Sequence, residues 1–239
     1  MSIIECLDLF DRSILAVTGC GGKTSFINLL AEKKRDKKVL ISPTTKTYPL
    51  YADRVKLCKT LQQCEEHQPQ TGVQCLGILN TATGKLGPLP EHVLADMMPD
   101  YDLMLLEADG CRGLLCKGWR ENEPVIPWFC THTVGIVTMN ALGSAATESI
   151  IHRLPEFLSI TGLQKGKPIT PQALEAMVCS AQGMFKNSAG ARYLLVNQVE
   201  DNTTARIARS FLQRIKKNYS NHFTKLLYGS VHLDMWQEV

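Results

Sequence analysis

The residues best suited to chemistry follow the apolar run 14–17 near the start of the chain. They are Gly19, Cys20, Gly21, Gly22, Lys23, Thr24 and Ser25. Glycines permit positive φ and let backbone N–H groups approach a ligand, and the positive end of a following helix favours anions at the same place. Lys23 would reach the terminal phosphates of a nucleotide, and Thr24 would bind Mg²⁺ between them. The segment therefore predicts a phosphate-binding loop, although Val17 stands where the usual pattern begins with glycine. The alternative is a glycine turn that only closes a strand–helix unit, but such a turn does not require Lys-Thr at the start of the helix.

Two acids end a second apolar run, at 103–106. Glu107 and Asp109 stand two residues apart, on the same side of the chain if the strand continues that far. A buried parallel strand presents a carboxylate to Mg²⁺ in this way. One acid could hold the metal through water while the other orients an attacking water. A strand that ends in an ordinary acidic turn is the alternative.

A polar segment follows the short apolar run 39–42 and contains Thr44, Thr45 and Lys46. Ligands of open α/β sheets lie beyond the carboxyl ends of the strands, so this segment should lie near the phosphates. Thr44 or Thr45 could add a hydroxyl to Mg²⁺, and Lys46 could contact phosphate. A Pro-Thr turn that opens a helix explains the same residues.

The stretch 111–127 is long, irregular and rich in charge, which is more typical of a functional loop than of a simple connection. Arg112, Lys117 and Arg120 could neutralise phosphate charge. Cys111 and Cys116 could bind a soft metal or handle sulfur or selenium, or they are ordinary reduced cysteines. Further on, residues 147–158 have a helical pattern that includes His152, a candidate base or phosphate contact, or a surface or capping histidine.

A guanine-reading motif is suggested by Asn197 at the end of the run 193–196 of largely apolar residues. In an N-K-x-D motif the asparagine orients the loop, the lysine stem packs on the base, and the aspartate accepts from the base N–H groups. Here Gln198 replaces lysine, and Glu200 or Asp201 must replace aspartate. A strand that ends in a polar loop fits equally well, so guanine and adenine both remain open.

Apolar runs that alternate with helical patterns predict a mostly parallel sheet between two layers of helices. We therefore expect an α/β fold, a three-layer P-loop NTPase-like domain. A chain of 239 residues lies within the range of one domain. Residues 1–239 are assigned to a single P-loop nucleotide-binding domain, and residues 72–90 are a candidate hairpin insertion.

Composition restricts the partners and the compartment. A net charge of +3 from 26 basic and 23 acidic residues gives no global field that would recruit nucleic acid or a membrane. The 9 cysteines include no Cys-x-x-Cys pair and are odd in number, which indicates a reducing compartment rather than a disulfide framework. The first residues are acidic where a signal peptide is basic, and no apolar run has membrane-spanning length. We expect a cytoplasmic protein.

Several of these motifs together resemble the YqeC family. They are residues 18–24, 44–46, the run Glu107 to Gly110 with Arg112 and Gly113, residues 123–127, the pair His152 and Arg153, and the Asn197 loop. The resemblance extends roughly from the first strand to the Asn197 loop and is weakest in the last forty or so residues. It implies an accessory role in the maturation of selenium-dependent molybdenum hydroxylases, with such a hydroxylase or its cofactor-assembly proteins as partners.

Motifs and resemblance together predict a protein that binds and hydrolyses ATP or GTP with Mg²⁺ during cofactor assembly. The alternatives are a small-molecule kinase or nucleotidyl transferase on the same scaffold, and a non-enzymatic chaperone gated by nucleotide. Catalytic roles are assigned to Lys23, Glu107 and Asp109, and metal ligation to Thr24, Thr45 and Asp109. The nucleotide contacts are assigned to Gly19, Cys20, Gly21, Gly22, Lys23, Thr24, Ser25, Lys46, Arg112 and Asn197.

Overall fold

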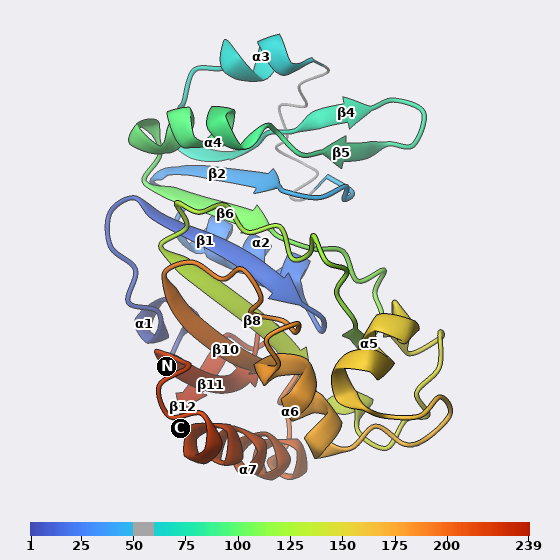
Figure 1. Cartoon of the computed structure of the whole chain (residues 1–239). Coiled ribbons are helices and arrows are strands. Elements are labelled where there is room, and N and C mark those ends of the chain that lie inside the picture. Colours follow the sequence, from blue (N-terminus) through green and yellow to red (C-terminus); the bar gives the residue numbers. More distant parts are fainter. Residues whose placement is uncertain (50–59) are drawn as a thin grey trace.

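A computed structural model describes residues 1–49 and 60–239 of the chain. Within these residues the main sheet has eight strands in the order β12-β11-β10-β8-β1-β6-β2-β3, and only the pair β11 and β12 is antiparallel (Figure 1). Its strands are β1 (Ser13–Gly19), β2 (Lys38–Pro43), β3 (Gly72–Cys75), β6 (Leu103–Glu107), β8 (His132–Thr138), β10 (Ala191–Asn197), β11 (Lys225–Ser230) and β12 (Met235–Glu238). The α/β, P-loop NTPase-like fold predicted from the sequence is confirmed.

Helices cover both faces of the sheet, because alternate residues of each strand point to opposite faces. On one face, Leu15 and Val17 of β1 pack with α1 (Ile3–Cys6) and α2 (Lys23–Lys33). On the other face, Ile14 and Ala16 belong to a cluster with α3 (Leu61–Glu65) and α4 (Glu91–Met97). The same face carries α5 (Leu154–Thr161), α6 (Pro171–Cys179) and α7 (Asn202–Asn218), packed near Leu194 and Val196 of β10. Every residue of β1, β6 and β8 is buried, which explains why these strands are continuous apolar runs.

Smaller elements lie outside this sheet. β4 (Ile78–Asn80) and β5 (Lys85–Gly87) form a hairpin within the predicted span 72–90, but residues 72–75 belong to β3 at the edge of the main sheet. A parallel pair joins β7 (Cys116–Lys117) to β9 (Ile151–His152). The short 3₁₀ helices are η2 (Met98–Asp100) and η3 (Met139–Ala141). No helix in residues 1–49 or 60–239 is both long and apolar enough to cross a membrane.

The prediction of one helix over residues 147–158 is wrong. Residues 151–152 pair with β7, and α5 begins only at Leu154. Arg153 between them has φ 58°, a left-handed conformation that interrupts a right-handed helix. Pro155 then stands in the first turn of α5, a position where its missing N–H costs nothing.

The carboxyl ends of the central parallel strands meet at one edge of the sheet. Val17 is in register with Glu107, and Gly19 with Ile136. One strand further along, Asn197 is in register with Thr138. The loops that follow these strands therefore share the position at which ligands of open α/β sheets bind.

Candidate functional site

The loop between β1 and α2 depends on its glycines. Gly19, Gly21 and Gly22 have φ values of 100°, 93° and 122°, which side-chain-bearing residues rarely adopt. A Cβ on Gly19 would lie 2.3 Å from the Ile136 carbonyl oxygen, and one on Gly22 would lie 2.4 Å from Asn197 Nδ2. The N-cap of α2 is Gly22, which has no side chain to accept from the first N–H groups of the helix. The loop therefore has the backbone that an anion-binding nest requires.

Lys23 lies inside this loop with only 3 % of its surface exposed. Its Nζ donates to the Gly19 carbonyl oxygen at 2.6 Å and lies 3.1 Å from Asp109 Oδ1. Burial lowers the pKa of Lys23, but Asp109 together with Cys111, Cys20 and Glu107 outweighs burial, and the net pKa is raised. Lys23 is therefore a fixed positive charge within the phosphate loop.

Asp109 is a fully buried acceptor for several donors. Thr18 Oγ1 donates to Oδ2 at 2.8 Å, the Gly19 N–H donates to both oxygens at 3.2 Å, and Trp119 Nε1 donates to Oδ2 at 2.6 Å. A second ammonium group, Lys117 Nζ, lies 3.3 Å from Oδ2. Burial raises the pKa of Asp109, but the two lysines and these hydrogen bonds bring it down to about 2. This carboxylate ties the phosphate loop to the segment that follows β6, and its predicted role as a metal ligand stays a prediction.

The irregular segment 110–127 is anchored by buried ion pairs. Lys117 is fully buried, donates to the Gly110 carbonyl oxygen at 2.8 Å, and lies 3.5 Å from Glu123 Oε2. Glu123 also pairs with Arg153. The ammonium group of Lys117 is thus held by protein acceptors, whereas Arg120 is exposed and pairs with Glu156 at 3.4 Å. Sequence reasoning gave Trp119 no role, and its spacing from Asp109 carries no signal of their contact.

Glu107, Thr24 and Thr45 are the oxygen donors that suit Mg²⁺. Thr24 is exposed at the start of α2, and its Oγ1 donates to Glu107 Oε1 at 3.5 Å. In the described part of the chain, Glu107 Oε2 and Thr45 Oγ1 are buried without a hydrogen-bond partner. Burial raises the pKa of Glu107, and the charge of Lys23 and a side-chain hydrogen bond with Thr47 oppose this. Unsatisfied buried oxygens are rare in proteins, and a bound cation or water at each of these oxygens would satisfy it.

The hydroxyl of Thr44 is committed elsewhere, because it donates to the Val125 carbonyl oxygen at 2.7 Å. Lys46 is exposed and lines a cavity of about 570 Å³ with the β4–β5 hairpin. Arg112 is exposed at the start of segment 110–127 and has φ 53°. Ser25 is exposed beside Thr24 at the start of α2. The nucleotide contacts assigned to Lys46, Arg112 and Ser25 stay predictions.

Asn197 joins the phosphate loop to the end of β11. Its Nδ2 donates to the Gly21 carbonyl oxygen at 2.7 Å, and its Oδ1 accepts from the Val231 N–H at 2.8 Å. Glu200 and Asp201 are the two acids predicted as candidates for recognising a nucleotide base. Glu200 accepts from Ser230 Oγ at 2.8 Å, and Asp201 caps α7 by accepting from the Thr203 and Thr204 N–H groups. Asn197 thus contacts the loop before α2, and both acids have protein donors, while base recognition by this segment stays a prediction.

Two thiols meet beside Lys23. Cys20 is buried in the phosphate loop, and Cys111 is half-buried at the start of segment 110–127. The hydrogen bond from Cys20 lowers the pKa of the Cys111 thiol to about 5, against burial. Burial raises the pKa of Cys20 instead. Cys116 is a buried thiol, and burial alone raises its pKa to about 12.

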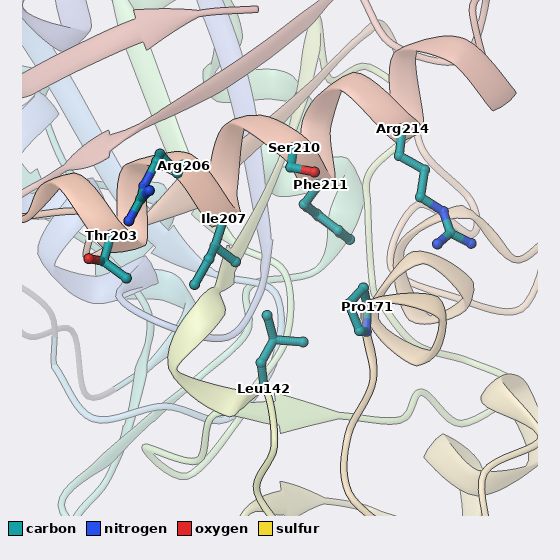
Figure 2. Close-up of a pocket in the computed structure, with 8 residues that line it drawn as sticks. All are labelled: Leu142, Pro171, Thr203, Arg206, Ile207, Ser210, Phe211 and Arg214. Atoms are coloured by element: carbon teal, nitrogen blue, oxygen red, sulfur yellow. The ribbon is translucent and has the colours of Figure 1, made fainter.

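A separate cavity of about 450 Å³ lies against α7 (Figure 2). Its lining comes from α7, from Leu142 after η3 and from Pro171 of α6; the α7 residues are Thr203, Arg206, Ile207, Ser210, Phe211 and Arg214. Figure 2 shows the α7 side chains on the helix side of this space and Leu142 and Pro171 opposite. The lining includes none of the residues predicted to do chemistry, so the phosphate loop remains the candidate site.

The described residues 1–49 and 60–239 contain no cluster of three or more His, Cys, Asp or Glu side chains that could hold a metal by themselves. Mg²⁺ does not need such a cluster, because it is usually bound by one or two carboxylates together with substrate phosphates and water. The donor set of Glu107, Thr24 and Thr45 fits that pattern.

Fold and loop geometry together define a P-loop-type α/β protein. The chain belongs to the YqeC family, since the family model described as "YqeC protein" matches residues 15–155. It is 32% identical over 181 residues to a protein of Escherichia coli (strain K12) described as "Uncharacterized protein YqeC", and the aligned region covers 73% of this chain and 71% of that relative. The family resemblance predicted from the motifs is confirmed.

Proposed function

We propose that this protein binds ATP or GTP with Mg²⁺ at the loop from Gly19 to Thr24 and hydrolyses it. The observation that carries the proposal is the pair of buried, unpartnered oxygens, Glu107 Oε2 and Thr45 Oγ1, in a site where Glu107 also contacts Thr24. Buried oxygens without donors support this proposal, because a P-loop protein needs oxygen ligands for the cation that accompanies its phosphates.

Each residue has a distinct task in this proposal. The backbone of the three glycines and the first turn of α2 bind the phosphate oxygens, and Lys23 neutralises their charge. Thr24, Thr45 and Glu107 would hold Mg²⁺, which when bound neutralises phosphate charge and orients the oxygens. Asp109 fixes Lys23, and with Glu107 it is the candidate for orienting an attacking water.

A direct test follows the fate of the γ-phosphate. The purified protein is incubated with ATP or GTP labelled at that phosphate, with and without Mg²⁺ and candidate small-molecule acceptors. We expect Mg²⁺-dependent release of inorganic phosphate, and its loss in Glu107→Gln while nucleotide binding persists. Glu148→Gln, an exposed carboxylate paired with Lys165, is the matched control and should behave as the parent protein does. Equal turnover in Glu107→Gln and the parent would contradict the assignment.

A kinase or nucleotidyl transferase is the second candidate. It is favoured by Arg112, an exposed cation held at φ 53° directly after the acid-bearing strand, because strained non-glycine residues cluster at functional sites. In the same assay a kinase would place the label on the acceptor rather than in free phosphate. Arg112→Ala should then lose this transfer.

We further propose, from the family resemblance, an accessory role in the maturation of a selenium-dependent molybdenum hydroxylase. A maturation factor acts on the cofactor of its target, so loss of the factor should leave the hydroxylase synthesised but inactive. The test is elemental analysis of the hydroxylase purified from deletion, complemented and Lys23→Ala strains. Selenium or finished molybdenum cofactor should be deficient except in the complemented strain. Full selenium, molybdenum and activity in the deletion strain would exclude this role.

A further inference from the structure

Cys20 and Cys111 are brought together by the central pairing of the sheet. Strands β1 and β6 are neighbours in the sheet (Figure 1). Val17 is in register with Glu107. The segments that follow β1 and β6 continue side by side past the last paired residues of these strands. The Ala108 N–H donates to the Val17 carbonyl oxygen at 2.9 Å, and the Gly19 N–H donates to the Asp109 side chain at 3.2 Å. Cys20 directly follows Gly19, and Cys111 is two residues after Asp109.

The two thiols are in contact and differ in exposure. Each thiol affects the pKa of the other through a side-chain hydrogen bond, and Cys20 is 1 % exposed whereas Cys111 is half-buried. A small oxidant can therefore meet Cys111 first, and Cys20 is placed to react second. All eight cysteines in the described part of the chain are free thiols, so this pair is reduced in the structure. Thiols placed as an accessible attacking group with an adjacent resolving group are typical of redox-sensitive sites.

We propose that Cys20 and Cys111 are an oxidative modification site, at which a peroxide joins the phosphate loop to segment 110–127 through a disulfide. In the first step the Cys111 sulfur attacks one peroxide oxygen, the O–O bond breaks, and a sulfenic acid and water form as the thiol proton passes to the leaving oxygen. In the second step the Cys20 sulfur attacks the Cys111 sulfur, and the sulfenic oxygen leaves as water with the Cys20 proton. Two thiols and one hydrogen peroxide thus give one disulfide and two waters.

The disulfide would act on the loop that the proposed function uses. A bonded sulfur pair is about 2.05 Å apart, much closer than two thiols in contact, so the bond must draw Cys20 toward segment 110–127. Cys20 stands between Gly19 and Gly21, and its N–H already donates to the Ile136 carbonyl oxygen at 2.9 Å. Moving Cys20 therefore disturbs the nest that receives phosphate. This consequence rests on the proposed function, whereas the thiol pair itself does not.

The test maps the disulfide and then measures binding. The full chain is treated with hydrogen peroxide, alkylated, digested without reductant and analysed by mass spectrometry. We expect one peptide pair joined through Cys20 and Cys111, reversed by dithiothreitol, absent in Cys111→Ser and retained in the control Cys116→Ser. Alkylation of Cys111 after treatment as complete as before it, or a disulfide from Cys111 to another cysteine, would overturn the proposal.

Calorimetry with MgATP and MgGTP then tests the consequence. The oxidised parent should bind at least about tenfold more weakly than the reduced parent, and dithiothreitol should restore binding. Peroxide should leave binding by Cys111→Ser unchanged. A joined pair with unaltered nucleotide binding would overturn the effect on the loop. Absence of binding in the reduced parent would instead refute the proposed function, while the joined peptides would still establish the thiol pair.

Discussion

Replacing Asp109 by asparagine removes one buried negative charge from between two buried ammonium groups. Lys23 lies 3.1 Å and Lys117 3.3 Å from the carboxylate, and the three side chains are 2 % exposed or less. The asparagine side chain would retain one oxygen acceptor for Thr18 or Trp119, so the main loss is electrostatic. Lys117 keeps its contact with Glu123, whereas Lys23 would keep only the Gly19 carbonyl oxygen.

The size of this loss follows from the pKa of Asp109. Folding lowers it from 3.8 to about 2, which corresponds to roughly 2.5 kcal/mol of preference for the ionised form. Breaking a buried ion pair by removing one partner typically costs about 3–5 kcal/mol, because the other charge is left uncompensated. We therefore expect Asp109→Asn to lower the free energy of unfolding by about 3 kcal/mol at neutral pH.

The assay is urea unfolding followed by tryptophan fluorescence across a pH series. Because folding lowers this pKa, the contribution of the carboxylate is complete above 3.8 and is lost as the pH falls toward 2. The parent should lose stability in that interval, and Asp109→Asn should lack this part of the acid dependence. The control Glu148→Gln should match the parent at neutral pH. A loss below about 1 kcal/mol in Asp109→Asn, or an unchanged acid dependence, would refute the electrostatic role assigned to Asp109.

Two further predictions concern the loop and the base. Gly22→Ala should abolish nucleotide binding measured by calorimetry, because the added Cβ would lie 2.4 Å from Asn197 Nδ2. The control Gly84→Ala is also at positive φ but has no atom within 4 Å, and it should bind nucleotide as the parent does. Equal binding by both variants would contradict the close approach of Asn197. Competition between ATP and GTP should show only a modest preference, because Gln198 and Glu200 stand where a guanine-reading loop has lysine and aspartate. A preference for GTP above about a thousandfold, more than one bidentate base contact supplies, would show that this loop does read guanine.

The parts of this structure that the sequence predicts depend on local pattern. The apolar runs 14–17 and 103–106 become β1 and β6 because strands buried on both faces need apolar residues throughout. Gly19, Gly21 and Gly22 form the tight loop before α2 because its positive φ values require glycine there. The N-cap role of Asp201 was not predicted, although an aspartate before a helical pattern is a typical N-cap.

The contacts that sequence reasoning misses join distant or irregular segments. Trp119 and Lys117 reach Asp109 through segment 110–127, whose path no periodicity describes. The meeting of Cys20 and Cys111 follows from the adjacency of β1 and β6, and local pattern carries no information on strand order. The predicted helix over 147–158 fails for a related reason, because pairing of β9 with the distant β7 overrides local helical preference.

Calorimetric titration of the parent, Lys23→Ala and Lys37→Ala with MgATP and MgGTP tests the central claim most directly. Lys23→Ala should still fold, because Asp109 keeps Lys117 as its partner, and circular dichroism checks this. Lys37 is an exposed lysine beyond the end of α2 and serves as the matched control. Loss of one charge-assisted contact costs about 1.5–3 kcal/mol, so Lys23→Ala should bind about ten- to more than a hundredfold more weakly, with Lys37→Ala unchanged. Binding by folded Lys23→Ala as tight as that of the parent, or no binding of either nucleotide by the parent, would contradict the account.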